Sequence, residues 1–184
     1  KLFDCYTGFK WIATVMRENE GKAHYLGGGE ESYGFLAEDF VRDKDSVSAI
    51  SLMAEIAAWA KDKNMTMNDM LIDVYLTYGY SKERGISVVR KGKSGAEEIQ
   101  AMMKNFRENP IKEIAGSPVV KIKDYDSLEE KDLASGTVTK LVMPVTSNVL
   151  QYYTADGTKV SIRPSGTEPK IKFYLELHDK LECA

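Results

Sequence analysis

The fold of the second half of the chain is decided by the stretch VLQYYTADGTKVSIRPSGTEPKIKFYLEL, residues 149–177. Residues 149–153 and 159–162 predict two strands, and the Asp156-Gly157 pair between them predicts a hairpin turn. Residues 171–177 alternate apolar and charged side chains, which is typical of a third strand with one buried face. The stretch therefore predicts antiparallel strands, the last two of which hold a loop between them.

That loop, at 163–169, reads RPSGTEP and combines groups that bind a phosphate. The guanidinium of Arg163 offers a planar fork of donors that matches phosphate oxygens. Ser165 and Thr167 add hydroxyl donors, and Gly166 lets backbone N–H groups approach an anion closely. An ordinary turn with one solvated arginine is the alternative, and the loop alone leaves both interpretations open.

Helical periodicity predicts three helices in the first part of the chain, at about 8–19, at 46–62 and from Thr66 onward. The helix at 46–62 has Ser46 as its expected N-cap and is apolar on most sides, which predicts burial between layers. Thr66 and Asp69 form a predicted capping box for the third helix. A short strand is expected at 23–26.

The pattern breaks at residues 78–85, where helical periodicity ends and glycines appear. We place a domain boundary here, which divides the chain into residues 1–80 and residues 81–184. A strand at 86–89, a helix with a capping box formed by Ser94 and Glu97, and a strand at 119–123 are expected to follow.

Composition excludes several classes of protein. The chain has 184 residues and a net charge of −3, which gives no reason to expect a nucleic-acid partner. No apolar run approaches the roughly 20 residues that cross a bilayer, and no signal peptide is visible. The two cysteines and two histidines lack metal-ligand spacing, so we expect no metal site, reduced thiols and a cytoplasmic location. Because the first residue is not methionine, we expect a piece of a longer chain.

Two further segments contain groups that bind a hydroxylated or anionic ligand. Glu30 and Ser32 alternate in a glycine-rich loop, so in an extended conformation both face one side and can bind sugar hydroxyls. Arg42 and Lys44 precede the helix at 46–62, where the helix dipole disfavours cations and a ligand would explain their presence. The alternatives are a flexible acidic surface loop and an ordinary charged helix start.

Together these segments resemble the α-D-phosphohexomutase family of phosphoglucomutases and phosphomannomutases. The matching motifs are TGFKWI at 7–12, GEESYG at 29–34, RDKD at 42–45 and RPSGTEP at 163–169, in the order and spacing of the family. The resemblance covers essentially the whole chain and implies the last two of the family's four domains. It implies an α/β part, a third domain with a mixed sheet at 1–80 that is incomplete at its N-terminus. An α+β part follows at 81–184, a smaller fourth domain with an antiparallel sheet and helices on one face.

The resemblance also implies roles for individual residues. Glu30 and Ser32 correspond to the sugar-binding residues, with Arg42 beside them, and Lys44 corresponds to a general acid/base or substrate contact. Four residues correspond to those that bind the phosphate that is not being transferred: Arg163, Ser165, Gly166 and Thr167. The family's Ser-His-Asn segment and its Asp-x-Asp-x-Asp loop for Mg²⁺ are absent from this sequence. Both belong to the first two domains, which would be a further partner of this chain.

The function implied is the interconversion of hexose 1-phosphate and hexose 6-phosphate through a bisphosphorylated sugar, with glucose 1,6-bisphosphate as intermediate and activator. On this hypothesis the chain binds sugar hydroxyls and the distal phosphate, and alone it does not turn over substrate. Activity on a phosphopentose or a phosphomannose is an alternative. A non-catalytic phosphosugar-binding module and a structural domain pair without a ligand are the others, although clustered glycines and cations fit the last poorly.

Overall fold

The computed structural model describes residues 1–30, 33–166 and 168–181. The chain divides into two compact units, residues 1–73 and residues 74–184, and each is described by itself. Helix α3 (Met67–Tyr78) crosses the point of division. Among the described residues, no helix is both long enough and apolar enough to cross a lipid bilayer.

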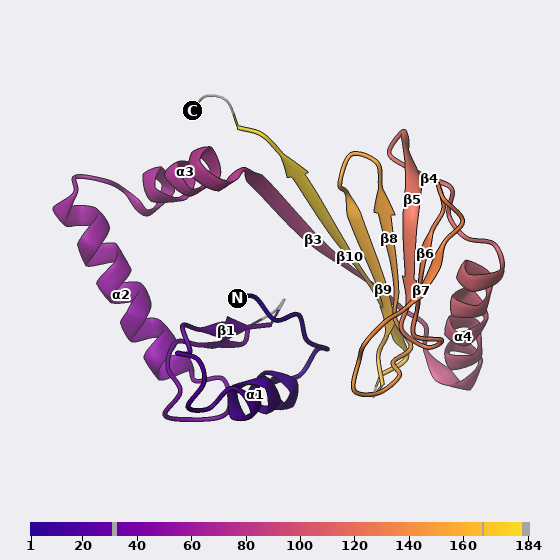
Figure 1. Cartoon of the computed structure of the whole chain (residues 1–184), viewed down its shortest axis with the longest axis horizontal. Helices are drawn as coiled ribbons and strands as arrows, with labels where there is room; N and C mark the ends of the chain where they lie inside the picture. The colour runs from indigo at the N-terminus through magenta and orange to yellow at the C-terminus, as the bar shows by residue number, and fades with distance from the viewer. Residues whose placement is uncertain (31–32, 167, 182–184) are drawn as a thin grey trace. The chain divides into compact units, whose positions relative to one another are not determined.

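The first unit contains α1 (Phe9–Glu18), the two-residue strands β1 (Gly28–Gly29) and β2 (Phe35–Leu36), α2 (Ser46–Asp62) and most of α3. Figure 1 shows α1 beside the β1–β2 pair, which is antiparallel. The buried cluster of the first unit consists of Phe9, Met16 and Leu36. The strand predicted at 23–26 is wrong, because strand pairing begins later, at Gly28. The expected mixed sheet is represented by this one antiparallel pair among the described residues.

The sequence predicted Ser46 as the N-cap of α2, but the N-cap is Asp45. The Asp45 carboxylate accepts hydrogen bonds from the backbone N–H groups of Val47 and Ser48, each at 3.1 Å. These bonds satisfy two of the donors that a helix start leaves without partners. The capping box predicted for α3 is confirmed, since the Asp69 carboxylate accepts from Thr66 and the Asp69 N–H donates to Thr66 Oγ1.

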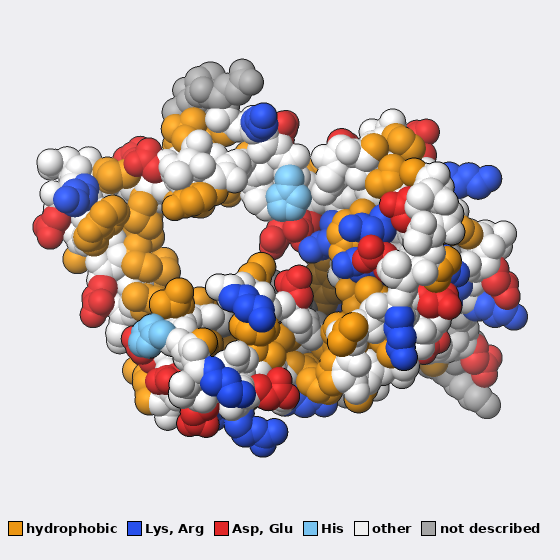
Figure 2. Space-filling model, in the orientation of Figure 1, with side chains coloured by type: hydrophobic (Ala, Val, Ile, Leu, Met, Phe, Trp, Pro, Cys, Tyr) orange, Lys and Arg blue, Asp and Glu red, His pale blue; other side chains and the backbone are white. Residues whose placement is uncertain are grey.

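The apolar surface of α2 is largely exposed within this chain, so the predicted burial between layers is wrong here. Only Ala60 of the helix is buried, while the side chains of Val47 and Ile50 are 72% and 70% exposed. Figure 2 shows hydrophobic side chains along this helix on the viewed surface. The all-round apolar pattern predicts that a helix has partners, but it does not say where in the sequence they are.

The cap at Asp45 gives the helix a dependence on pH. A hydrogen bond with the Ser48 side chain and bonds from the backbone N–H groups of Ser48 and Val47 lower the pKa of Asp45. A lowered folded-state pKa means that the cap stabilises above the ordinary aspartate pKa of about 3.9 and is lost as pH falls through the folded value. Far-UV circular dichroism is therefore expected to show more helix lost on acidification in wild type than in Asp45→Asn, which keeps an acceptor that does not titrate. Equal acid transitions in the two proteins would contradict this role.

The second unit is built on one antiparallel sheet with the strand order β3-β10-β9-β8-β5-β6-β7, with β4 paired to β5 at the side. The strands are β3 (Tyr80–Val89), β4 (Glu113–Ile114), β5 (Ser117–Asp124), β6 (Glu129–Asp132), β7 (Val138–Lys140), β8 (Leu150–Thr154), β9 (Lys159–Pro164) and β10 (Lys170–Asp179). The predicted strands β5, β8, β9 and β10 and the hairpin between β8 and β9 are confirmed. This sheet-rich second part after the helical first part confirms the predicted fold class.

One face of the sheet carries the core and the other is polar. Helix α4 (Gly92–Glu108) places Ile99 and Met103 in a buried cluster with Leu150, Tyr152 and strand residues of β5, β9 and β10. Tyr152 is fully buried, its hydroxyl donates to the Phe106 carbonyl at 2.8 Å, and burial raises its pKa to about 12. The predicted capping box at Ser94 is wrong, because α4 begins at Gly92, after an N-cap at Lys91.

Candidate functional site

Glu30 and Lys44 are brought together at the tip of the β1–β2 hairpin. Gly29 pairs with Phe35, and the N–H of Glu30 donates to the Gly34 carbonyl at 2.8 Å, so Glu30 and Gly34 lie side by side just beyond the paired strands. The Lys44 ammonium lies 3.3 Å from Oε2 of Glu30, whose side chain is only 12% exposed. An ammonium carries three hydrogens, so Lys44 can bind Glu30 and still donate to a ligand oxygen.

Gly34 makes this pairing possible because it leaves room for both side chains. A Cβ atom at this position would lie 2.6 Å from Glu30 Oε2 and 3.2 Å from Lys44 Cδ and from Phe9 Cε2. The Lys44 ammonium also lies over the Phe9 ring, 5.4 Å from its centroid, which adds a cation–π attraction. The absence of a side chain at Gly34 therefore leaves the space that the Glu30 carboxylate and Lys44 occupy.

Arg42 is not joined to this pair. Its guanidinium lies 3.2 Å from Glu20, and both side chains are substantially exposed, so the ion pair contributes little to stability. Ser32, which the sequence places beside Glu30, lies outside the described residues. Of the predicted sugar-binding group, the structure thus joins Glu30 to Lys44 and leaves Arg42 in contact with Glu20, just beyond the end of α1.

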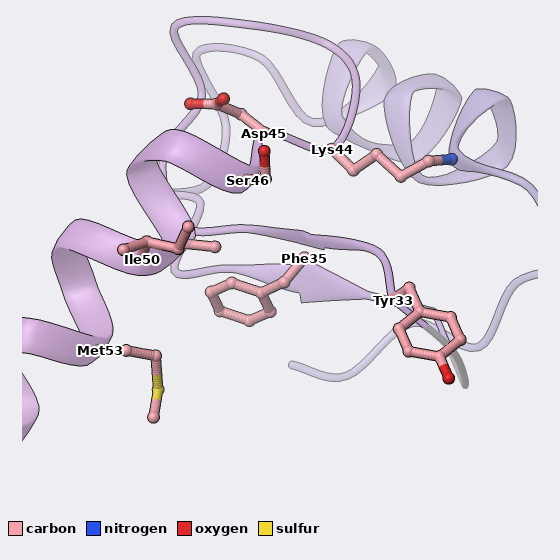
Figure 3. A pocket seen from close by; sticks show the side chains of 8 residues that line it. Tyr33, Phe35, Lys44, Asp45, Ser46, Ile50 and Met53 are labelled. Carbon is pink, nitrogen blue, oxygen red and sulfur yellow. The ribbon is translucent and has the colours of Figure 1, made fainter.

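A hollow of about 440 Å³ adjoins Lys44 at the start of α2. Figure 3 shows Phe35, Ile50 and Met53 at its apolar side, while the Lys44 side chain extends away from them. The hollow thus has an apolar wall from α2 and β2 and a cation at its edge. Such a mixture suits a ligand that has both a ring face and polar groups.

The second candidate site is the loop between β9 and β10. The N–H of Ser165 donates to the Lys170 carbonyl at 2.8 Å, and the N–H of Glu168 donates to Ser165 Oγ at 3.2 Å. Ser165 therefore helps to close the loop through its side chain. A Cβ atom at Gly166 would meet none of the described atoms within 4 Å, so the space beside it is open. Thr167 lies outside the described residues.

Arg163 stands at the end of β9 on the polar face of the sheet, because its neighbour Ile162 points into the core. Its Nη2 donates to the Tyr174 hydroxyl at 3.4 Å. Its Nε is buried and has no hydrogen-bond partner among the described residues. A buried donor without a partner costs free energy, so this nitrogen would gain from a hydrogen-bond acceptor near the loop.

Lys172 faces Arg163 directly across the β9–β10 pair. Like charges in directly opposed positions destabilise a sheet unless an anion lies between them or nearby. Glu168 is such an acid: its pKa is lowered by hydrogen bonding to Lys170, by the charge of Lys170 and further by the charge of Lys172. Two cations therefore meet at the end of the hairpin that carries the loop.

Both halves of the chain match models of one protein family. Residues 1–78 match phosphoglucomutase/phosphomannomutase α/β/α domain III, and residues 86–183 match the C-terminal domain of phosphoglucomutase/phosphomannomutase. The chain belongs to the phosphoglucomutase/phosphomannomutase family. The family predicted from the four sequence motifs is confirmed, as is the assignment to its C-terminal domains.

Relatives within this family are much longer than the chain. It is 36% identical over 171 residues to a phosphoglucomutase of Staphylococcus haemolyticus and 40% identical over 171 residues to one of Staphylococcus aureus strain RF122. Each match covers 93% of this chain and 31% of the relative, so the chain spans about a third of their length. The open form of pp63/parafusin, a phosphoglucomutase from Paramecium, has a similar fold with a TM-score of 0.59. That structure is 20% identical, and the match covers 99% of this chain and 30% of the Paramecium chain.

The residues present do not fit the Mg²⁺ that the family resemblance implies. A metal site needs several ligand side chains close together. Among the described residues, no group of three histidine, cysteine, aspartate or glutamate side chains could hold a metal ion. Carboxylate oxygens are the ligands that Mg²⁺ prefers, and here Glu30 is committed to Lys44.

Lys172 is the residue of the loop site that the motif did not include. It lies beyond the RPSGTEP loop in sequence, in the strand where charged and apolar residues alternate. The signal was the hairpin itself: a loop that joins two antiparallel strands brings the residues at equal distance from its centre face to face. Counting outward from the loop would have placed Lys172 opposite Arg163.

Proposed function

We propose that this chain is the substrate-gripping part of a phosphoglucomutase-like enzyme that interconverts hexose 1-phosphate and hexose 6-phosphate. A phosphoryl group passes from an enzyme phosphoserine to the free sugar hydroxyl, and the other phosphoryl group then returns to the serine, so a bisphosphorylated sugar is the intermediate. The phosphoserine, the Mg²⁺ ligands and the other domains are expected outside this chain. Phosphoryl transfer depends on positioning and charge stabilisation, which is what binding residues supply.

The observation that carries the proposal is the pair of cations at the β9–β10 loop. Arg163 offers a planar fork with one buried donor lacking a described partner, and Lys172 adds a second charge directly opposite. A phosphate at this loop would satisfy the donor and offset the repulsion. We propose that Arg163, Lys172, Ser165 and the backbone around Gly166 hold the phosphate that is not being transferred, with Thr167 as a further hydroxyl donor.

The first unit is proposed to bind the sugar. Glu30 accepts hydrogen bonds from sugar hydroxyls with Ser32 beside it, and Lys44 either contacts the substrate or acts as a general acid/base. The 3.3 Å contact between Lys44 and Glu30 supports a shared site. Arg42 is proposed as a weaker contributor, because its guanidinium is directed at Glu20. We thus propose that residues 1–80 bind the sugar and residues 81–184 bind the phosphate.

The test is Arg163→Ala in the full-length enzyme, assayed for conversion of glucose 1-phosphate to glucose 6-phosphate. Loss of a charged, forked contact is expected to raise KM about tenfold or more, because a charge-assisted hydrogen bond contributes roughly 1.5–3 kcal/mol. Arg90→Ala is the matched control, since Arg90 forms an exposed ion pair with Glu98 at 3.1 Å instead. Equal KM values for wild type and Arg163→Ala would reject the proposed phosphate grip.

A non-catalytic phosphosugar-binding module is the second candidate, and the exposed hollow beside Lys44 is the observation in its favour. Calorimetric titration of the 184-residue chain with glucose 6-phosphate tests whether the chain binds the ligand by itself, as such a module would, and a turnover assay of the longer protein separates the two candidates. Binding without turnover in the longer protein would support the module. Turnover of glucose 1-phosphate, mannose 1-phosphate or a pentose 1-phosphate by the longer protein would instead support the enzyme and identify its sugar.

A further inference from the structure

Tyr174 lies on the polar face of the sheet, beside the two cations of the loop site. It is in β10, two residues beyond Lys172, and pairs with Ser161 of β9, while its neighbours Phe173 and Leu175 pack against the core. Lys172 and Arg163 form the next pair along the same hairpin. The strand pairing therefore fixes the Tyr174 ring beside both charged side chains.

One side chain thus contacts both cations in different ways. The Tyr174 hydroxyl oxygen accepts a hydrogen bond from Arg163 Nη2 at 3.4 Å. The Lys172 ammonium lies over the Tyr174 ring, 5.7 Å from its centroid, where the negative face of the π-system attracts a cation. The rest of Arg163 is less restrained, since its Nε has no partner among the described residues.

Long cationic side chains that face each other repel and have many rotamers. Each would lose considerable conformational entropy on binding an anion unless something already held it in place. A ring fixed in a central strand can hold both at a small entropic cost, because tyrosine has few rotatable bonds. Side chains that are oriented before binding give tighter binding for the same contacts.

We infer that Tyr174 is a positioning residue that orients Arg163 and Lys172 toward one phosphate. The inference rests on the proposed function of the β9–β10 loop as a phosphate grip. Tyr174 acts through the two cations: its hydroxyl sets the direction of the guanidinium fork, and its ring keeps the ammonium on the same side. Substrate affinity thus depends on a hydroxyl group that need not touch the substrate.

The test compares Tyr174→Phe with wild type in the full-length enzyme, because this change removes the acceptor for Arg163 and keeps the ring beneath Lys172. We expect KM for glucose 1-phosphate to rise about fivefold while kcat stays within about twofold, because one long hydrogen bond to the charged guanidinium is lost. Tyr174→Leu also removes the ring and is expected to raise KM about twentyfold. The thermal unfolding midpoint is measured for each variant, so that KM is compared between folded proteins.

Tyr153→Phe is the matched control. Tyr153 lies on the same polar face, donates its hydroxyl to Gln151 at 2.8 Å and has Lys121 over its ring, 4.6 Å from the centroid, yet it stands in β8 and not beside Arg163. An unchanged KM for this variant is expected. A fivefold rise in KM for Tyr153→Phe as well would overturn the inference, because the effect would then belong to the polar face in general.

A double-mutant cycle separates this inference from the proposed function. If Tyr174 acts through Arg163, Tyr174→Phe should add little to the KM of an Arg163→Ala variant. Additive effects, or an unchanged KM for Tyr174→Phe beside a raised KM for Arg163→Ala, would overturn the positioning role and leave the phosphate grip standing. An unchanged KM for Arg163→Ala itself would overturn both.

Discussion

Replacing Gly95 by alanine is expected to destabilise the second unit by about 3 kcal/mol, the upper end of the range for overpacked cores. Gly95 is buried in the first turns of α4, and a Cβ atom there would lie 2.3 Å from the carbonyl oxygen of Arg90 and 2.4 Å from its carbonyl carbon. A backbone carbonyl cannot rotate away as a side chain can, so the helix or the end of β3 has to move. Arg90 in turn donates its N–H to the Pro169 carbonyl at 2.8 Å, so the displacement reaches the loop between β9 and β10.

Denaturant unfolding of the chain measures this effect, with Gly85→Ala as the matched control. Gly85 lies in β3, and a Cβ atom there would meet nothing within 4 Å among the described atoms. The same chemical change at Gly85 should be neutral or slightly stabilising, because alanine reduces the freedom of the unfolded chain. A Gly95→Ala variant as stable as the Gly85→Ala variant would show that α4 is not packed against Arg90 in this way.

Replacing Arg107 by alanine is expected to cost roughly 3 kcal/mol, the lower end of the range for breaking a buried ion pair. The Arg107 guanidinium binds the Asp124 carboxylate through two bonds, at 2.8 and 3.2 Å, and also donates to Asn148 Oδ1 at 2.8 Å. The two charged side chains are only 23% and 16% exposed. Removal of Arg107 leaves the Asp124 carboxylate largely buried without its cation. It also removes the bonds that join the end of α4 to the end of β5 and to the segment before β8.

The control for Arg107 is Lys104→Ala, in the same helix. Lys104 pairs with Glu108 at 3.6 Å, but both side chains are well exposed, so its loss should cost about 0.5 kcal/mol or less. The two variants are compared by the midpoint of urea unfolding, with the slope checked for two-state behaviour. Similar midpoints for both would contradict a structural role for the Arg107 bonds.

The sequence predicted best those elements whose own residues carry the pattern. Strands β8, β9 and β10 alternate or flank a strong turn signal, and the cap of α3 involves two side chains only three residues apart. Strands β6 and β7 were not predicted, because the residues of β6 are all charged and their pairing depends on β5, where Lys123 lies 3.3 Å from Glu130. Likewise α4 begins before its apparent capping box because Gly95 packs inside the helix against Arg90, a contact that no local pattern reveals.

For the candidate site, the sequence proposed binding roles that stay predictions, and the structure bears on the geometry alone. The side-chain types of Glu30, Lys44 and Arg163 indicated sugar and phosphate binding, and the structure brings Glu30 to Lys44 across a hairpin. The neighbour of Arg42 could not be foreseen, because Glu20 is 22 residues away and has no motif. Lys172 and Tyr174 lie outside the motif and come next to Arg163 through strand register, so they are found only by counting outward from the loop along both strands.

Strand β10 is the last strand of the sheet in sequence, yet it lies between β3 and β9. Its pairing with β3 runs from Lys170 opposite Val89 to Asp179 opposite Tyr80. Strand β3 therefore pairs with a strand that is synthesised much later. Closing so long a loop before any pairing rewards it is slow. On the ribosome, the β8–β9 hairpin can form early, whereas β3 can join the sheet only after β10 has emerged. The polar face that carries Arg163 and Tyr174 is therefore complete only once β10 has paired with β9.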